Sequence, residues 1–432
     1  MNYYSLNKRA PISSFANAVI KGLAPDRGLY FPEDIKPLPK SFFDTIDNKS
    51  YETIAYEAIQ QFVDPEIPQD ILKQIVKETL SFDFPVVQIN DSISTLELFH
   101  GPTMAFKDVG ARFMARCLGH FNKDNNEEVT VLVATSGDTG GAVANGFLGV
   151  KGVNVVILYP SGKVSDIQEK QLTTLGQNIR ALEVDGVFDD CQDMVKKAFL
   201  DDSITSKMQL TSANSINVAR WLPQLFYFMF AYKQLHKQHD DIVFVVPSGN
   251  FGNICAGMVA QQLGLPVKHF VAANNANHVV TTYLENEAYE PQPTTATISN
   301  AMDVGNPSNF VRIQEIYGHD FERLKNNLSS YHYTDDETRS AMLELYQKYD
   351  YVADPHGAVG YLGCKDYLEA NPNAHCVFLE TAHPVKFLDV VENTIGQRVP
   401  IPEQIKTVID KEKVATKIKS YQELKSFLLS TI

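Results

Sequence analysis

Short β-branched runs alternate with helical stretches from Glu128 onward. Continuous apolar residues predict buried strands at 129–134, 153–159, 242–246, 267–272 and 376–379. Strands that alternate with helices in this way are typical of an α/β fold with largely parallel sheets. Ligands of such sheets bind at the carboxyl ends of the strands, so the turns that follow these strands are where a site is expected.

The first part of the chain has a different pattern, with helical periodicity at 51–62 and 68–80 between Pro-containing turns. The aromatic run at 221–232 is too short to cross a membrane and is interrupted by Pro223, so it predicts a core helix. Thr, Asn and Pro dominate 291–307, which predicts a long loop near a domain face. We expect an N-terminal domain at 1–95, a smaller α/β domain at 96–235 and a larger α/β domain at 236–432.

Composition limits the classes of partner. The 432 residues carry a formal net charge of -14, which opposes binding to nucleic acid or to anionic membranes. The five cysteines are scattered and form no CxxC pair, which indicates a reducing compartment and no zinc site. The start of the chain lacks the pattern of a signal peptide. We therefore expect a cytoplasmic protein without a metal, and a monomer or homodimer.

Two glycine-rich turns follow predicted strands and lead into helices. The turn Gly249–Asn253 lets backbone amides approach an anion, and the absence of a Gly-Lys-Ser/Thr triplet favours a small phosphate group over ATP. The other turn begins at Ser136 and contains Asp138. Two alternatives stay open here: a tight turn without any ligand, and Asp138 as a helix cap only.

Lys107 lies in the run His-Gly-Pro-Thr-Met-Ala-Phe-Lys-Asp at 100–108. A lysine in an apolar setting becomes a nucleophile when desolvation or a neighbouring cation lowers its pKa. The alternative is a lysine whose stem covers apolar surface while its ammonium stays in water. Near the C-terminus, Thr381 follows the last predicted strand and projects at the same carboxyl edge, while His383 receives no role.

Together these segments resemble the threonine synthase family of microbial type. The family has the pyridoxal-phosphate-dependent fold type II shared with the tryptophan synthase β subunit. The resemblance is carried by residues 22–30, 100–108, 134–141, 159–171, 214–224, 249–253 and 380–387. It implies a lyase that converts O-phospho-L-homoserine and water into L-threonine and phosphate by γ-elimination and β-addition, as the last step of threonine biosynthesis.

The resemblance also implies roles for the cofactor site. Lys107 corresponds to the lysine that holds pyridoxal 5'-phosphate covalently and then moves protons at the substrate carbons. Thr381 corresponds to the residue that hydrogen-bonds the pyridine nitrogen. Asp138 stands beside the 3-oxygen where many relatives carry Asn, and an ionised Asp cannot donate a hydrogen bond there. The turn that binds the cofactor phosphate corresponds to Gly249, Asn250, Phe251, Gly252 and Asn253. Arg27 departs from the small residue expected in the N-terminal motif.

For the substrate, the resemblance implies that Thr135, Ser136 and Thr139 bind the amino-acid carboxylate. The expected binding residues for its phosphate are Lys163, Asn214, Ser215, Asn217 and Arg220. Lys163 and Arg220 are the candidate countercharges, because a dianion in a net acidic protein needs local cations. The alternative for both is a cation that merely pairs at the protein surface, on a helix in the case of Arg220.

Two other functions remain open on the sequence. A hydroxyamino-acid dehydratase or β-replacing synthase of the same fold has no use for a substrate-phosphate cluster. A non-catalytic relative that keeps the fold as a binding protein is disfavoured by Lys107, Thr381 and the glycine turn, although a fold alone does not establish activity.

Overall fold

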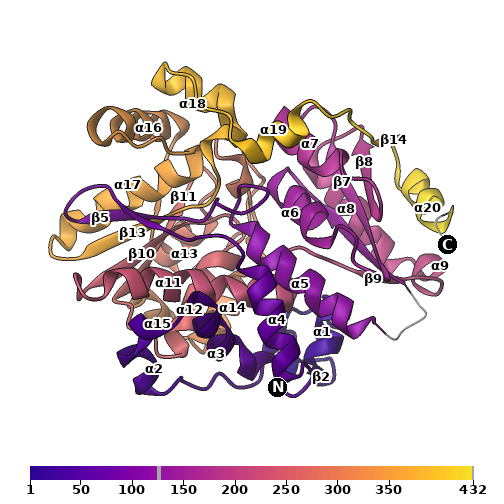
Figure 1. Cartoon of the computed structure of the whole chain (residues 1–432), viewed down its shortest axis with the longest axis horizontal. Helices are drawn as coiled ribbons and strands as arrows, with labels where there is room; N and C mark the ends of the chain where they lie inside the picture. Colours follow the sequence, from indigo (N-terminus) through magenta and orange to yellow (C-terminus); the bar gives the residue numbers. More distant parts are fainter. Residues whose placement is uncertain (124–127, 431–432) are drawn as a thin grey trace.

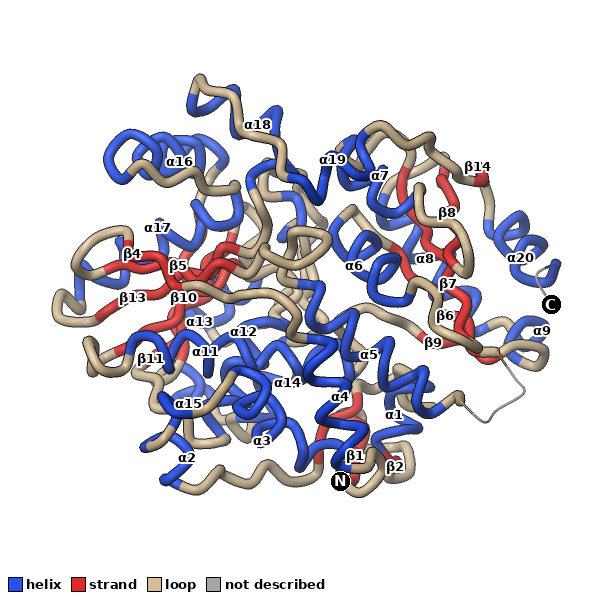
Figure 2. Tube along the Cα trace, in the orientation of Figure 1, coloured by secondary structure: helices blue, strands red, loops and turns tan. Residues whose placement is uncertain are grey.

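The computed structural model describes residues 1–123 and 128–430, which form two α/β halves and a small antiparallel sheet near the N-terminus (Figure 1). One half is built on a six-stranded sheet and the other on a five-stranded sheet. Figure 2 shows the two sheets as separate groups of strands with helices around each. The predicted fold class, two mostly parallel sheets plus an N-terminal region, is confirmed.

The six-stranded sheet has the order β12-β11-β10-β13-β5-β4, and only β4 pairs antiparallel with its neighbour. Val243 and Val245 face one apolar cluster, whereas Phe244 and Val246 face another, so this sheet is covered on both faces. Burial on both faces explains the continuous apolar runs in the sequence. The strands are β4 (Val86–Gln88), β5 (Ile93–Glu97), β10 (Ile242–Pro247), β11 (His269–Asn274), β12 (Leu328–His332) and β13 (His375–Glu380).

The five-stranded sheet has the order β14-β8-β7-β6-β9 and is parallel throughout. Its strands are β6 (Val129–Ala134), β7 (Val153–Pro160), β8 (Ile179–Val184), β9 (Gln209–Thr211) and β14 (Thr416–Ile418). Its helices are α5 (Lys107–Phe121), α6 (Asp138–Phe147), α7 (Asp166–Thr173), α8 (Phe188–Leu200), α9 (Asp202–Thr205) and α20 (Tyr421–Ser430).

The N-terminal region pairs its strands in the order β2-β1-β3, all antiparallel. Its elements are β1 (Asn2–Ser5), β2 (Ser13–Ser14), α1 (Phe15–Lys21), β3 (Tyr30–Pro32), α2 (Lys40–Asp44), η1 (Ile46–Asn48), α3 (Tyr51–Val63) and α4 (Gln69–Thr79). The helices of 51–62 and 68–80 are thus confirmed, with α4 beginning after Pro68, whose fixed φ suits a helix start.

The remaining helices lie after β9. They are α10 (Val218–Trp221), η2 (Leu222–Gln224), α11 (Leu225–Leu235), α12 (Gly252–Gln262), α13 (Val279–Asn286), η3 (Asn300–Met302), α14 (Phe310–Ile316), α15 (Phe321–Lys325), α16 (Asp335–Tyr349), α17 (Pro355–Ala370), η4 (Pro384–Phe387), α18 (Leu388–Ile395) and α19 (Glu403–Ile409). The predicted core helix at 221–232 corresponds mainly to α11, which is buried from Leu225 to Ala231. The predicted long loop at 291–307 contains η3.

Strand pairing crosses the predicted domain boundaries at two places. β5 spans the boundary at residues 95 and 96 and pairs with β13 in the six-stranded sheet. β14 lies within the predicted larger domain but pairs with β8 of the other half. Figure 1 shows this C-terminal segment passing from α18 through α19 to β14 and α20. The boundaries themselves stay a prediction. In the described ranges, no helix is long and apolar enough to span a bilayer.

Candidate active site

The loop before α5 places Lys107 beside Thr381. The Phe106 N–H donates to the Thr381 carbonyl at 2.9 Å, and the His383 N–H donates to the Met104 carbonyl at 3.0 Å. The loop after β13 and the loop before α5 are therefore joined by backbone hydrogen bonds in both directions. This pairing brings together two predicted site residues that are far apart in the sequence.

Side chains lock the same loop from within. Thr103 donates to Asp108 twice, from its N–H at 2.9 Å and from its hydroxyl at 2.5 Å. The Arg220 Nη1 donates to the Lys107 carbonyl at 2.8 Å, and the Tyr227 hydroxyl donates to the Phe106 carbonyl. The backbone at the start of α5 is consequently fixed on both sides, as a site that must hold one geometry requires.

The Lys107 amine lies in a partly buried environment with charges nearby. Its Nζ is 5.5 Å from the centroid of the Phe106 ring. Burial lowers the pKa of the Lys107 amine, the carboxylate of Asp138 opposes this shift, and the cations Lys386 and Arg220 add to it. A lysine with a lowered pKa has more of its nucleophilic, neutral form near neutral pH. The Lys107 geometry thus fits a lysine that attacks a carbonyl carbon.

Lys386 is a site residue that sequence reasoning missed. Its side chain is fully buried, and its Nζ lies 2.7 Å from Asp138 Oδ1 and donates to the Thr103 carbonyl at 2.8 Å. Burial alone would raise the pKa of Asp138, but the ammonium groups of Lys386 and Lys107 outweigh it and hold that pKa well below its usual range. The sequence feature that could have revealed Lys386 is its place in the apolar run Pro-Val-Lys-Phe, shortly after a buried strand.

The predicted phosphate turn joins β10 to α12. Phe251 precedes α12 in the left-handed conformation, with φ of 60°. Gly249 is needed for close packing, since a Cβ there would lie 2.7 Å from the Cα of Met302. Asn253 is buried, yet neither its Oδ1 nor its Nδ2 has a hydrogen-bond partner. A buried amide without a partner is costly and points to a group that the protein chain itself does not supply.

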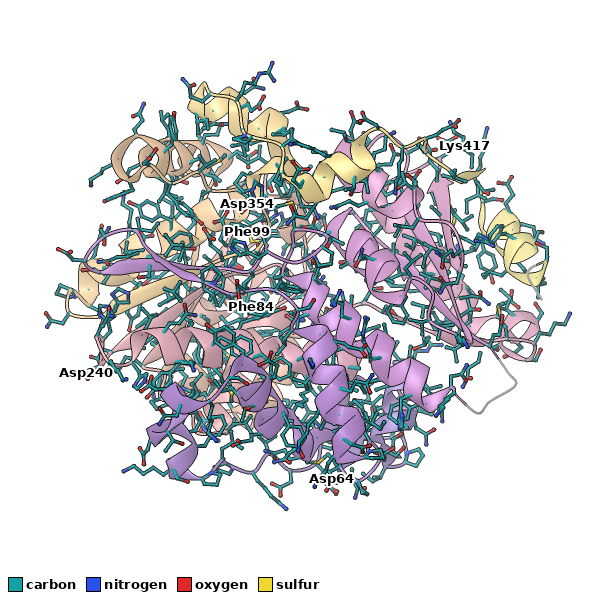
Figure 3. The ribbon with its side chains drawn as sticks, viewed as in Figure 1. Asp64, Phe84, Phe99, Asp240, Asp354 and Lys417 are labelled. Atoms are coloured by element: carbon teal, nitrogen blue, oxygen red, sulfur yellow. The ribbon has the colours of Figure 1, made fainter. Side chains whose placement is uncertain are left out.

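Thr381 follows Glu380, which anchors a buried polar network. The Asp354 N–H donates to Glu380 Oε1 at 2.6 Å, and Asp354 Oδ2 lies 2.5 Å from His356 Nδ1. The Ala301 N–H donates to His356 Nε2 at 3.1 Å, so His356 carries its proton on Nδ1. Burial and the neighbouring Asp354 carboxylate raise the pKa of Glu380. The network connects Thr381 to η3, which packs on the phosphate turn. Asp354, labelled in Figure 3 with Phe99, marks this region.

Three predicted carboxylate-binding residues lie where β6 leads into α6. The Thr135 hydroxyl accepts hydrogen bonds from the N–H groups of Gly137 at 2.9 Å and Gly140 at 2.8 Å, so it shapes the turn. Ser136 and Thr139 are partly exposed beside it. Asp138 occupies the first position of α6 and makes a buried ion pair rather than serving as a cap.

The predicted substrate-phosphate residues divide into exposed and buried groups. Lys163 is exposed after β7, and Asn214 and Ser215 are partly exposed. Asn217 is buried, accepts from Ala219 N–H at the start of α10 and donates to the Val19 carbonyl at 2.8 Å. Asn217 therefore fixes the segment through hydrogen bonds to Val19, Ser212 and Ala219, none of which involves Lys163.

Arg220 is buried and is not a surface cation. Its Nε donates to the Ala213 carbonyl at 2.7 Å, and burial lowers its pKa to about 10. A second arginine that the sequence reasoning missed, Arg312, donates to the carbonyls of Ser215 at 2.9 Å and Ile216 at 2.7 Å. Within the described ranges neither guanidinium forms an ion pair with a carboxylate. The 213–216 segment is therefore held by two cations.

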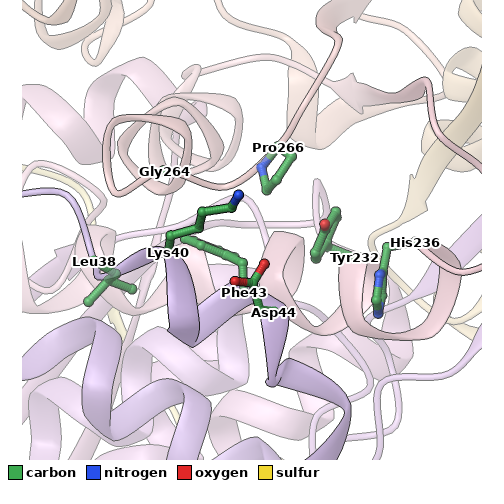
Figure 4. Close-up of a pocket in the computed structure, with 8 residues that line it drawn as sticks. All are labelled: Leu38, Lys40, Phe43, Asp44, Tyr232, His236, Gly264 and Pro266. Carbon is green, nitrogen blue, oxygen red and sulfur yellow. The ribbon is translucent and has the colours of Figure 1, made fainter.

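Figure 4 shows a surface depression that does not belong to the candidate site. It is formed where α2, α11 and the turn after α12 meet. Its lining residues are Leu38, Lys40, Phe43, Asp44, Tyr232, His236, Gly264 and Pro266. No predicted site residue is among them, so we assign it no part in the site.

Comparison with known proteins identifies the family. Three family models match the chain: threonine synthase N terminus at residues 2–80, pyridoxal-phosphate dependent enzyme at 93–381, and threonine synthase C-terminal at 357–428. Threonine synthase of Escherichia coli K12 is 43% identical over 406 residues, covering 94% of each chain. The chain belongs to the threonine synthase family. Threonine synthase of Serratia marcescens is 41% identical over 431 residues, with 99% of each chain covered.

Solved structures of threonine synthases agree in fold. The crystal structure of the E. coli protein superposes with a TM-score of 0.94 at 40% identity and covers all of both chains. That of the yeast protein gives 0.89 at 32% identity, covering 100% of this chain and 99% of that one. The structure of pyridoxal-phosphate-bound threonine synthase from Brucella melitensis gives 0.92 at 33% identity, covering 99% and 98%. Membership of the pyridoxal-phosphate-dependent, fold type II enzymes is thereby confirmed.

The described residues fit the cofactor of this family. An aldehyde needs a lysine of lowered pKa, and Lys107 has one. A phosphate group needs donors at a helix start, and the unpartnered amide of Asn253 lies in the first turn of α12. The loop of Thr381 is bonded to the loop of Lys107, and the neighbouring Glu380 is linked through Asp354 and His356 to Ala301 of η3. The fit thus rests on the unpartnered Asn253 amide and the lowered pKa of Lys107, as well as on membership of the family.

Proposed function

We propose that this member of the threonine synthase family converts O-phospho-L-homoserine and water into L-threonine and inorganic phosphate, with pyridoxal phosphate attached at Lys107. One observation carries the proposal. Lys107 is the first residue of α5, the pKa of its amine is lowered, and the preceding Phe106 donates its N–H to the Thr381 carbonyl. Such an amine suits both covalent attachment of an aldehyde and later proton transfer.

We assign the cofactor-binding roles as follows. Lys107 would form the covalent link, Thr381 would hydrogen-bond the ring nitrogen, and the turn Gly249–Asn253 would bind the phosphate group with backbone amides and the Asn253 side chain. When bound, the cofactor supplies a conjugated ring that delocalises the electrons left on a carbon that loses a proton. Thr381 would offer that ring a neutral hydroxyl as its partner in place of a charged side chain.

Lys107 also moves the protons in our proposal. With the cofactor bound, the Lys107 amine would take the proton from the substrate Cα and deliver protons later in the reaction. A general base works best with a pKa near the working pH, which is why burial beside Lys386 and Arg220 favours this role. Tyr227 and Arg220 hold the backbone on either side, so the amine returns to one position.

On the substrate side, Ser136 and Thr139 bind the amino-acid carboxylate at the start of α6, where free N–H groups favour an anion. Thr135 supports them by holding the turn. Lys163 contacts the substrate phosphate directly. The remaining residues of the phosphate site are Asn214, Ser215, Asn217 and Arg220, of which the buried two, Asn217 and Arg220, act by holding the segment.

Exchange of Lys163 for methionine is expected to raise KM for phosphohomoserine about 10- to 100-fold while kcat changes less than about threefold. The reason is loss of a charge-assisted hydrogen bond worth roughly 1.5–3 kcal/mol. Steady-state phosphate release measures both constants. Lys151→Met is the matched control, because Lys151 is equally exposed but precedes β7 at the opposite end of the same strand. Equal effects of both exchanges would contradict the assignment.

Product identification tests the function itself. With phosphohomoserine, ³¹P and ¹H NMR should show inorganic phosphate and threonine appearing in equal amounts. Free serine and free threonine should turn over at least about 100-fold more slowly, because they lack the phosphate that Lys163 recognises. Formation of a 2-oxo acid and ammonia from these free amino acids at a comparable rate would favour the dehydratase alternative.

We further propose that the protein works in the cytoplasm as a monomer or homodimer, without nucleic-acid or membrane partners. All five cysteines are buried and free of disulfides, which supports a reducing compartment. The net charge of -14 supports the absence of a polyanionic partner.

A further inference from the structure

Lys386 joins three parts of the molecule at one buried point. It belongs to η4, which follows β13 of the six-stranded sheet, and its side chain has no exposed surface. Its Nζ contacts Thr103 of the loop before α5 and Asp138 at the start of α6 in the other half. A buried ammonium is stable only when it is paired and hydrogen-bonded, so these contacts fix its position.

Asp138 is oriented through one oxygen only. Oδ1 is contacted by the Lys386 ammonium at 2.7 Å and accepts from Gln168 Nε2 at 2.8 Å. Within the described chain, no hydrogen bond to Oδ2 is made. Gln168 itself packs against Gly137, where an added Cβ would lie 2.5 Å from Gln168 Cδ. Lys386 and Gln168 thus hold Asp138 through the same carboxylate oxygen.

The charges around Lys107 oppose one another. The Asp138 carboxylate favours the ammonium form of Lys107, whereas the cations Lys386 and Arg220 disfavour it. Asp138 and Lys386 form a neutral pair, so removal of either member exposes Lys107 to the uncompensated charge of the other. The two removals therefore act on Lys107 in opposite directions.

We propose that Lys386 is a positioning residue for Lys107: its buried ammonium binds both the Asp138 carboxylate and the Thr103 carbonyl of the loop that leads to Lys107, and it balances that carboxylate at the junction of the two halves. The inference rests on the proposed role of Lys107 but on no particular substrate. In this role Asp138 acts as a carboxylate that accepts hydrogen bonds, so it need not donate one.

The test measures the ionisation of Lys107 in the full-length protein freed of cofactor. Formaldehyde and cyanoborohydride methylate lysines only when the amine is neutral, and mass spectrometry follows the Lys107 peptide across a pH series. Lys386→Met should move the midpoint up by about one pH unit or more, and Asp138→Asn should move it down by a similar amount. The double variant should return to within about half a unit of the native midpoint.

A purely structural role predicts a different pattern, because loss of packing does not shift the two single variants in opposite directions. Lys413→Met is the matched control: Lys413 makes ion pairs with Glu169 at 2.5 Å and Glu183 at 2.9 Å in the same half but does not act on Lys107. It should leave the Lys107 midpoint unchanged even if it lowers the melting temperature.

Two outcomes overturn the proposal: an unchanged midpoint in Lys386→Met, or shifts of the same sign in both single variants. If Lys386→Met does not fold, the comparison of Asp138→Asn with the double variant decides, and an equal midpoint in these two overturns it. Failure of the proposed role of Lys107 is recognised separately, because cofactor added to the native protein before borohydride reduction would then leave Lys107 unmodified.

Discussion

Replacement of Lys107 by alanine is expected to lower kcat/KM for phosphohomoserine by about 10⁴ or more. A positioned general acid or base contributes roughly 10²–10⁴ by itself, and Lys107 additionally forms the covalent link in our proposal. A loss of 10⁴ corresponds to about 5.4 kcal/mol of transition-state stabilisation. Initial rates of phosphate release at saturating cofactor measure the effect.

The fold should survive this exchange. Within the described residues, the Lys107 amine forms no ion pair, and the backbone of its loop is held by Asp108, Arg220 and Tyr227. Lys49→Ala is the control, since Lys49 pairs with Glu57 in the N-terminal region and should leave the rate unchanged. Added methylamine should restore part of the activity of Lys107→Ala. More than a tenth of the native kcat/KM without added amine would contradict the role of Lys107.

Asn253→Asp is expected to raise the dissociation constant for pyridoxal phosphate about 100-fold. The exchange keeps the shape but replaces a donor by a carboxylate that repels the phosphate, and a hydrogen bond to a charged group is worth roughly 1.5–3 kcal/mol. Stability without cofactor should fall moderately, because the new carboxylate is buried without a partner and its place in the first turn of α12 offsets only part of that cost. Equilibrium dialysis and thermal melts measure the two effects.

The matched control is Gln69→Glu, the same amide-to-carboxylate exchange at the exposed first position of α4. It should alter neither cofactor affinity nor melting temperature appreciably. A large loss of stability in cofactor-free Asn253→Asp with unchanged affinity would show that Asn253 supports the fold and does not meet the phosphate.

Much of the site could be predicted from the sequence because it lies at strand ends. Continuous apolar runs located β6, β7, β10 and β13, and the residues that follow them in parallel sheets meet at one edge. Thr381 was expected at that edge, and backbone hydrogen bonds of 2.9 and 3.0 Å join its loop to the loop of Lys107. The strand predicted at 267–272 is shifted to His269–Asn274, since Leu265 and Pro266 form a turn in which Val267 N–H donates to the Leu265 carbonyl.

Long-range pairing could not be predicted in the same way. Lys386 has no local pattern that reveals Asp138 as its partner, and Arg312 reaches Ser215 and Ile216 from a helix that is distant in the sequence. β14 has only three residues, two of them exposed, so no apolar run marks it as a strand of the other half. These features depend on how the two halves meet, which periodicity along one chain does not encode.

If Lys107 carries the cofactor, borohydride reduction of the protein saturated with pyridoxal phosphate will fix the cofactor to that one lysine. Mass spectrometry of the digested product should find a single reduced pyridoxyl group, on the peptide that contains Lys107, together with loss of visible absorbance. Reduction that leaves Lys107 unmodified, or that places the group on Lys386 or another lysine, would contradict the account.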